Sequence, residues 1–234
     1  MFNPEKIKPL KPVSENDSQN QEICKSEILD HIQSLREKGV FLGSGQTADV
    51  FYSKTNPRLC YKIIKAKAYY YNNVEEEAQF LSEARKITNT EVLIPEPEYS
   101  ISNEDESSNV LAMERLDAFS IEDLLNGRGE LPKNFDLYGF FKKLENFVVK
   151  LNQARIFHRD IHPGNIMIER KTGKPCLIDF GAAKKNYLSL EDPYRYLDPK
   201  GELIIFTNDL IGIRQVMQKV KKYILEKRAN GEVA

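Results

Sequence analysis

The segment FHRDIHPGNIMIERKTGKPCLIDFG, residues 157–181, constrains the fold of this chain more than any other part. Its Pro-Gly pair at 163–164 predicts a tight turn between Asp160 and Asn165. The runs NIMIE and PCLID that follow predict the two strands of a β-hairpin, which ends at Asp179. Because the hairpin brings the chain back to the turn, we expect Asp160, Asn165 and Asp179 to project into one cleft.

These three side chains suit one kind of reaction. Asn165 and Asp179 carry oxygen atoms, and Mg²⁺ is a hard cation that proteins hold through a few oxygen ligands together with substrate phosphates. Asp160 can then accept a proton from an attacking hydroxyl group. The segment therefore indicates metal-assisted phosphoryl transfer, and other parts of the chain should hold the phosphates.

A second region, VFLGSGQTADVFYS, places Gly43 and Gly45 between two strand-like runs, and RLCYKIIKA predicts a partner strand. Glycine lets backbone N–H groups approach phosphate oxygens, because no Cβ stands in the way. A plain hairpin turn would use the same glycines, so this pattern alone is weak. Lys62 strengthens it, since an ammonium group in an otherwise apolar strand has to reach a nucleotide phosphate, a helix carboxylate or solvent.

The segment NNVEEEAQFLSEARKITN predicts a helix that offers such a carboxylate. Its glutamates are Glu75, Glu76, Glu77 and Glu83. We expect three of the four to lie on a solvated face of the helix and one to pair with Lys62.

The composition limits the other function classes. The chain has 234 residues, 41% of them hydrophobic, which suits one domain of two lobes better than two independent domains. Its formal net charge of −1 gives no indication of nucleic-acid binding. The three cysteines, Cys24, Cys60 and Cys176, are widely spaced, which argues against disulfides and a zinc site and favours a reducing compartment. No apolar run approaches the roughly 20 residues that cross a bilayer, and the first residues lack the apolar core of a signal peptide.

Taken together, these motifs resemble the protein kinase superfamily. G-x-G-x-x-A-x-V at 43–50, Lys62, H-R-D-x-x-x-x-N at 158–165 and D-F-G at 179–181 follow the family's order at compatible spacing. The resemblance runs from about Val40 to Val216.

The resemblance implies an α+β, bilobal protein-kinase-like fold. A flexible tail is expected over 1–20 and a single kinase-like domain over 21–234. Its N-lobe, about 21–116, would be a small antiparallel β-sheet with one helix, and its C-lobe, about 117–234, would be reduced and mainly helical. The outline is most similar to small secreted bacterial effector kinases, and secondarily to kinases of the RIO/Bud32 type.

The resemblance also implies roles at matching positions, with ATP and Mg²⁺ as cofactors. Asp160 would be the base that orients the hydroxyl, and Asn165 and Asp179 the metal ligands. Glu83 is predicted to pair with Lys62, because it lies twelve residues before Pro95, near the family's spacing, while Glu77 is the alternative. The further nucleotide contacts would be Gly43, Gly45 and Ala48 over the phosphates, Val50, Cys60 and Met167 around adenine, Lys62 on the phosphates, Met113 as gatekeeper, and Glu114 to Leu116 as hinge. Asp209 would brace the H-R-D backbone.

One departure concerns the acceptor. His162 stands where serine/threonine kinases usually have a lysine, and H-x-D-x-H-P-G-N is also similar to aminoglycoside and choline phosphotransferases. Arg159 and the complete D-F-G are more like protein kinases. We therefore expect a serine/threonine protein kinase, a transferase that also phosphorylates itself. A small-molecule phosphotransferase and a pseudokinase interaction module are the alternatives.

A second departure is the short segment after Gly181, with only about two dozen residues following Asp209. We expect low basal activity and an activating protein partner, since ordering a loose segment costs about 1 to 2 kcal/mol per residue. In the effector kinases that the chain resembles, that partner is a ubiquitin-loaded conjugating enzyme, and a homodimer is the alternative.

The expected location is cytoplasmic, in the host cytoplasm for a secreted effector. Candidate phosphorylation sites are Tyr187, Ser189, Tyr194 and Tyr196.

Overall fold

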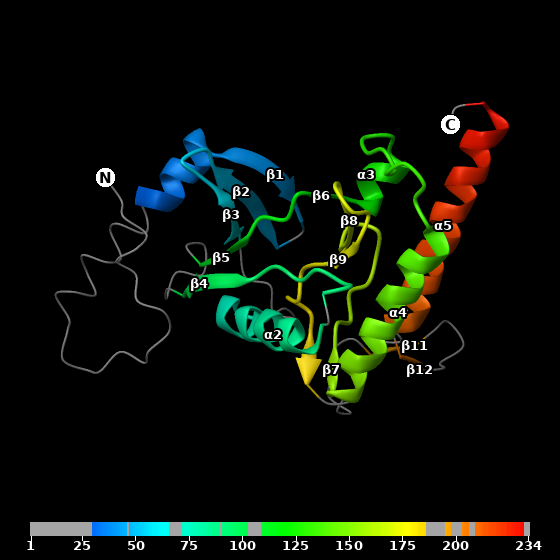
Figure 1. Ribbon diagram of the computed structural model, residues 1–234. Coiled ribbons are helices and arrows are strands. Elements are labelled where there is room, and N and C mark those ends of the chain that lie inside the picture. Colours follow the sequence, from blue (N-terminus) through cyan, green and yellow to red (C-terminus); the bar gives the residue numbers. More distant parts are fainter. Residues whose placement is uncertain are drawn as a thin grey trace. The chain divides into compact units, whose positions relative to one another are not determined.

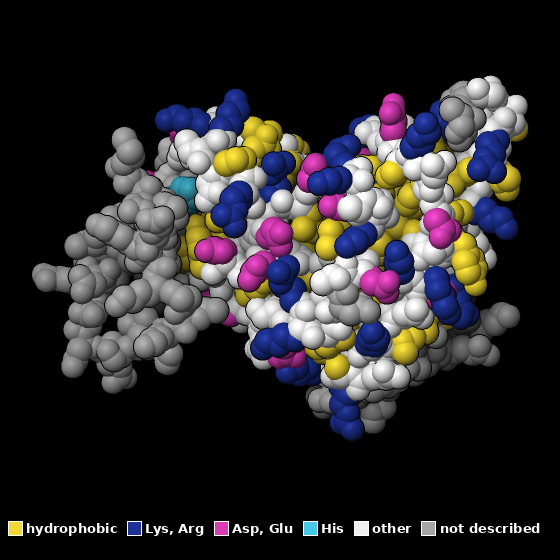
Figure 2. All heavy atoms as spheres, in the orientation of Figure 1, with side chains coloured by type: hydrophobic (Ala, Val, Ile, Leu, Met, Phe, Trp, Pro, Cys, Tyr) yellow, Lys and Arg dark blue, Asp and Glu magenta, His cyan; other side chains and the backbone are white. Residues whose placement is uncertain are grey.

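The computed structural model describes residues 30–45, 47–65, 72–88, 90–102, 109–185 and 209–231, together with the backbone at 195–197 and 203–205. Within these residues, no helix is long and apolar enough to cross a membrane. The tail, Cys24, Tyr187, Ser189 and Tyr194 lie outside the described residues. On the face in Figure 2, acidic and basic side chains are interspersed.

The chain divides into two compact units. The first, here called the sheet unit, takes Met1–Tyr69, Asn73–Ala78 and Glu96–Arg115. The second, the helical unit, takes Tyr70–Asn72, Gln79–Pro95 and Leu116–Ala234. Gln79–Pro95 thus groups with the helical unit, although it precedes part of the sheet unit in the sequence.

The sheet unit is built on one antiparallel sheet of five strands in the order β1-β2-β3-β5-β4 (Figure 1). The strands are β1 (Val40–Ser44), β2 (Ala48–Ser53), β3 (Asn56–Ile64), β4 (Pro97–Ile101) and β5 (Val110–Glu114). Side chains alternate between the two faces of a strand. Tyr61 and Ile63 of β3 therefore point to one face, and Cys60 and Lys62 to the other.

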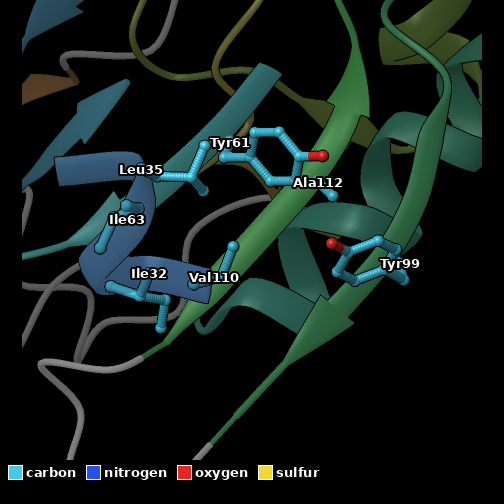
Figure 3. Close-up of a cluster of buried hydrophobic side chains, with 7 residues drawn as sticks. All are labelled: Ile32, Leu35, Tyr61, Ile63, Tyr99, Val110 and Ala112. Atoms are coloured by element: carbon cyan, nitrogen blue, oxygen red, sulfur yellow. The ribbon is translucent and has the colours of Figure 1, made fainter. Parts of the chain in front are cut away.

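The Tyr61 face carries the core of the sheet unit (Figure 3). Residues 30–38 form a helix whose apolar side chains pack on this face. The cluster consists of Ile32, Leu35, Tyr61, Ile63, Tyr99, Val110 and Ala112. Gly39 ends the helix, donating its N–H to Leu35 O at 2.9 Å, and a Cβ at this glycine would lie only 2.3 Å from that oxygen.

Helix α2 (Val74–Ile87) follows the sequence signals for a helix. Asn73 caps its start, since its Oδ1 accepts the Glu76 N–H at 2.8 Å. Glu75, Glu76 and Glu77 lie in the first turn and Arg85 and Lys86 in the last, as the helix dipole favours.

The helical unit contains α3 (Ile121–Leu125), α4 (Leu137–Gln153) and α5 (Asp209–Ala229), and α4 and α5 lie side by side (Figure 1). Its strands form three small sheets: β6 (Ala118–Ser120) with β8 (Ile166–Glu169) and β9 (Pro175–Leu177), β7 (Ile156–Phe157) with β10 (Lys184–Lys185), and β11 (Arg195–Leu197) with β12 (Leu203–Ile205). The apolar face of α4 fills the core with Phe140, Phe141, Leu144, Phe147, Val148 and Leu151. Ser120 caps α3 in a capping box with Asp123.

The expected fold class is confirmed. The structure is α+β, with an antiparallel sheet in its first part and a mainly helical second part. The first part has two helices, residues 30–38 and α2, where one was expected. The predicted hairpin between Asn165 and Asp179 is also present, as the antiparallel pair β8 and β9.

Candidate active site

A buried ion pair occupies the sheet unit. Lys62 Nζ lies 2.8 Å from Glu77 Oε2 and 2.9 Å from Oε1, and the two side chains are 7% and 3% exposed. Strand alternation directs Lys62 away from the Tyr61 core, while Glu77 comes from the first turn of α2. The two charges therefore neutralise each other where little water reaches them, and removing either one is expected to be costly.

The prediction that Glu83 pairs with Lys62 is wrong. Glu83 accepts hydrogen bonds from Gln79 at 2.9 Å and from Lys185 at 2.8 Å, and its side chain is 26% exposed. Six residues separate Glu83 from Glu77, which is about one and two-thirds turns, so the two carboxylates leave different sides of α2.

The apolar pattern of α2 distinguishes the two glutamates. Glu77 precedes Leu81 by four residues and Ala84 by seven, and all three side chains are buried. Glu77 thus lies on the apolar stripe of the helix, where a carboxylate needs a buried cation as its partner. That position was the signal in the sequence for choosing Glu77.

Two of the residues expected around adenine, Val50 and Cys60, share a face of the sheet with Lys62 and Met113. Val50 pairs with Lys62 across β2 and β3, and Cys60 pairs with Met113 across β3 and β5. Directly paired residues point to the same face, so these four side chains project on the side opposite the Tyr61 core. Burial raises the pKa of the Cys60 thiol to about 12, so this cysteine is an apolar surface rather than a nucleophile.

The glycine-rich turn and the expected hinge have local contacts of their own. Gly43 pairs with Val50, and the Gly45 N–H donates to Ala48 O at 2.9 Å. Glu114 ends β5, and Leu116 begins the next part of the helical unit. Met167 lies in β8, paired with Ser120 and Cys176. The nucleotide contacts of these residues remain predictions.

Asp209 anchors the H-R-D motif within the helical unit, as expected. Its carboxylate accepts the His158 N–H at Oδ2 and the Arg159 N–H at Oδ1, both at 2.9 Å. Burial raises the pKa of Asp209, although the nearby His158 and the two backbone donors act in the opposite direction. The start of α5 thereby fixes the backbone that leads into Asp160.

The loop of residues 158–165, here called the catalytic loop after the expected role of Asp160, holds Asp160 and Asn165 together. Asn165 Nδ2 donates to the backbone oxygen of Asp160 at 2.9 Å and to its Oδ2 at 3.1 Å. The Asn165 N–H also donates to His162 O at 3.0 Å, which closes the predicted Pro-Gly turn. These bonds orient the side-chain amide of Asn165, because its Nδ2 points at Asp160. The Oδ1 of Asn165 then points the other way, as the atom that could bind a metal ion.

The D-F-G motif is tied to this loop. The Ile178 N–H donates to Asn165 O at 3.0 Å, and His158 Nε2 lies 3.0 Å from Ile178 O. The His158 ring also meets the buried Phe180 ring edge-on, with centroids 4.7 Å apart. The structure therefore brings the segments carrying Asp160, Asn165 and Asp179 together, as the hairpin predicted.

The oxygen donors fit Mg²⁺. Asn165 contributes an amide oxygen whose direction is set by the Asp160 contacts, and Asp179 contributes a carboxylate. Asp179 has a positive φ of 62° and accepts the Gly181 N–H at 3.1 Å through Oδ1. A non-glycine residue in this strained region is found where surrounding structure enforces it, often at a functional site. One carboxylate and one amide oxygen match the few protein ligands that Mg²⁺ takes beside phosphates.

His162 contacts the expected base. Its Nε2 lies 3.7 Å from Asp160 Oδ2, and its Nδ1 accepts the Gly164 N–H at 3.0 Å. The nearby Asp160 carboxylate raises the pKa of His162, and burial lowers it by a smaller amount. The imidazole thus lies beside the Asp160 carboxylate, which favours its protonated form.

Comparison with known proteins gives the family. The protein kinase domain family matches residues 36–196, so the chain belongs to the protein kinase family. A serine/threonine-protein kinase C of Synechocystis is 49% identical over 43 residues, which are 18% of this chain and 8% of that protein. Serine/threonine-protein kinase PknA of Nostoc is 50% identical over 36 residues, 15% of this chain and 6% of that protein. Serine/threonine-protein kinase prk-2 of Caenorhabditis elegans is 30% identical over 99 residues, 39% of this chain and 22% of that protein. The matches thus span less than a quarter of the length of these relatives.

Proposed function

We propose that the chain catalyses ATP-dependent, Mg²⁺-assisted phosphoryl transfer to serine and threonine hydroxyl groups of proteins, including its own. The observation that carries this proposal is the catalytic loop, in which the Asn165 amide donates to Asp160, the expected base. The same hydrogen bonds orient the Asn165 oxygen that we propose as a metal ligand. An interaction module without chemistry has no need for this arrangement.

The chemistry follows from the charges. Asp160 accepts the proton of the acceptor hydroxyl group while the oxygen of that hydroxyl bonds to the γ-phosphorus of ATP. The bond between the γ-phosphorus and the β–γ bridging oxygen breaks, and ADP leaves. Mg²⁺, when bound, would neutralise the phosphate oxygens from the side of Asn165 and Asp179. Lys62, oriented by Glu77, would direct its positive charge to the phosphates.

The acceptor class is the next part of the proposal. The relatives named above are serine/threonine-protein kinases, which favours a protein hydroxyl. One observation favours a small-molecule acceptor instead, namely that His162 stands where serine/threonine kinases usually have a lysine. The His162 ring lies beside Asp160, where the acceptor would bind.

The deciding experiment measures ³²P transfer from ATP with Mg²⁺ to the protein alone, to casein, and to a panel of aminoglycosides and choline, with Asp160→Asn as control. We expect label on serine and threonine of casein and of the chain itself, absent with Asp160→Asn. Label on an aminoglycoside or choline alone would replace the protein acceptor. No transfer and no stabilisation by Mg²⁺ and ATP would overturn the proposal. Repeating the wild-type assay over a range of protein concentrations, and with ubiquitin conjugates, tests for an activating partner.

A further inference from the structure

Asn72, just before α2, makes an unusually complete set of contacts with the segment that follows Asp179. Its side-chain Nδ2 donates to Phe180 O at 3.1 Å and to Ala183 O at 2.8 Å. Its backbone N–H donates to Gly181 O at 2.6 Å. Its Oδ1 accepts from Lys184 Nζ at 2.7 Å. All of these residues belong to the helical unit.

The amide of Asn72 is therefore satisfied at every position. Both side-chain N–H groups and the carbonyl oxygen have partners, and the residue is only 8% exposed. The acceptors are backbone carbonyls, which an amide N–H can satisfy and a carboxylate cannot. Phe180 O also accepts the Ala183 N–H at 3.0 Å, so the loss of Asn72 acts mainly on the Ala183 carbonyl. A buried carbonyl that loses a donor is destabilised, so the side chain of Asn72 helps to fix the segment from Phe180 to Ala183.

Neighbouring contacts hold the same segment from two further directions. Lys184 and Lys185 form β10, which pairs with Phe157 and Ile156 directly before the H-R-D motif. Lys185 also reaches Glu83 of α2 at 2.8 Å. The chain after Gly181 is thus fixed to β7, to Glu83 and to Asn72, and the Asn72 contacts are the ones adjacent to Asp179.

We propose that Asn72 is a positioning residue for Asp179: by donating to the carbonyls of Phe180 and Ala183, it holds the D-F-G backbone where the Asp179 carboxylate can bind Mg²⁺. This inference rests on the proposed kinase function. Asn72 touches neither substrate nor metal in this scheme and acts through the backbone of Asp179.

Three variants separate this role from simple stabilisation. Asn72→Ala removes all the side-chain contacts. Asn72→Asp keeps the size and the Lys184 partner but replaces both N–H donors with an acceptor. Asp136→Ala, the control, removes the N-cap of α4, whose Oδ1 accepts the Gly139 N–H at 2.9 Å. It costs stability in the same unit through contacts that do not involve the D-F-G motif.

The first readout is the Mg²⁺ dependence of turnover at saturating ATP. Partners that orient metal ligands typically contribute 10- to 100-fold to metal affinity or activity. Both Asn72 variants should therefore raise the half-saturating Mg²⁺ concentration and lower kcat by about 10-fold or more. The Asp136→Ala enzyme should stay near wild type below its melting temperature. Near-wild-type values for Asn72→Asp would overturn the proposal, because the Lys184 contact alone would then suffice.

The second readout needs no activity. Amide hydrogen exchange of the peptide covering 180–185, measured without nucleotide, should be faster in Asn72→Ala and Asn72→Asp than in wild type or Asp136→Ala. Equal exchange in Asn72→Ala and Asp136→Ala would overturn the positioning role. If wild type shows neither phosphoryl transfer nor stabilisation by Mg²⁺ and ATP, the proposed function fails, and hydrogen exchange still decides whether Asn72 holds the segment.

Discussion

Replacing Glu77 with glutamine tests the buried ion pair and the assignment of Glu77 over Glu83. The substitution keeps the shape of the side chain but leaves the Lys62 ammonium, 7% exposed, beside a neutral amide. Breaking one partner of a buried pair typically costs about 3 to 5 kcal/mol. For a domain whose total stability is of the order of 5 to 15 kcal/mol, this loss is large.

Glu83→Gln is the matched control on the same helix. Its partner Lys185 is 50% exposed and Glu83 itself 26% exposed, so solvent screens the pair. Exposed pairs of this kind contribute about 1 kcal/mol or less. The two substitutions are chemically identical and differ in the burial of the pair that they break.

The measurement is urea-induced unfolding followed by circular dichroism, with ³²P transfer from ATP measured at low temperature, where both variants are folded. We expect Glu77→Gln to lose several kcal/mol and most of its activity, and Glu83→Gln to lose little of either. Losses of equal size in the two variants would refute the burial argument. The double variant Lys62→Met with Glu77→Leu should regain stability without regaining activity, since an apolar pair can replace a buried ion pair in packing but not in phosphate binding.

Four further substitutions test the catalytic loop and the D-F-G motif. Asp160→Asn should lower turnover by about 10²- to 10⁴-fold while nucleotide binding, measured by thermal shift, is kept; equal losses would indicate a structural aspartate. Asp179→Ala should abolish the stabilisation by ATP that depends on Mg²⁺, and unchanged stabilisation would exclude it as a metal ligand. The folded-state pKa of His162 is raised by Asp160, so its contact stabilises the protein at acidic pH and is lost as pH rises through that pKa. Wild type should therefore exceed His162→Gln in stability by more at pH 5.5 than at pH 8.5, whereas a constant difference would show that the Asp160 contact is not ionic. With a protein acceptor, His162→Lys should be tolerated or activating, and it should reduce transfer sharply if the ring shapes a small-molecule pocket.

The catalytic loop and hairpin could be predicted because their determinants are local. A Pro-Gly turn and two short strands lie within one continuous segment, and the hydrogen bonds that hold Asp160 and Asn165 span five residues. Local backbone preferences therefore decide the geometry before distant contacts form. Lys62 could be selected for a similar reason, since a cation between apolar strand neighbours is conspicuous in the sequence alone.

The choice between Glu77 and Glu83 required the phase of a helix. Spacing to a later proline counts residues along the chain, but a buried contact depends on which side of α2 a residue occupies. Glu77 shares the stripe of Leu81 and Ala84, whereas Glu83 lies off it and meets Lys185. The apolar pattern of the helix, rather than the spacing to Pro95, predicts Glu77 as the partner of Lys62 that the structure shows.

Asn72 was missed because its side-chain N–H groups donate to backbone oxygens 108 and 111 residues away, and backbone acceptors leave no mark in a sequence. Two asparagines precede α2, and an asparagine before a helix ordinarily suggests a cap. Only Asn73 serves in that role, through its contact with the Glu76 N–H. One cap position accepts one such side chain, so the second asparagine has no local function in the helix. A polar residue that is buried and locally unused must find its hydrogen bonds elsewhere in the chain. For Asn72 these hydrogen bonds are with the D-F-G backbone. Replacing Asn72 should therefore change Mg²⁺ binding at Asp179 rather than the stability of α2.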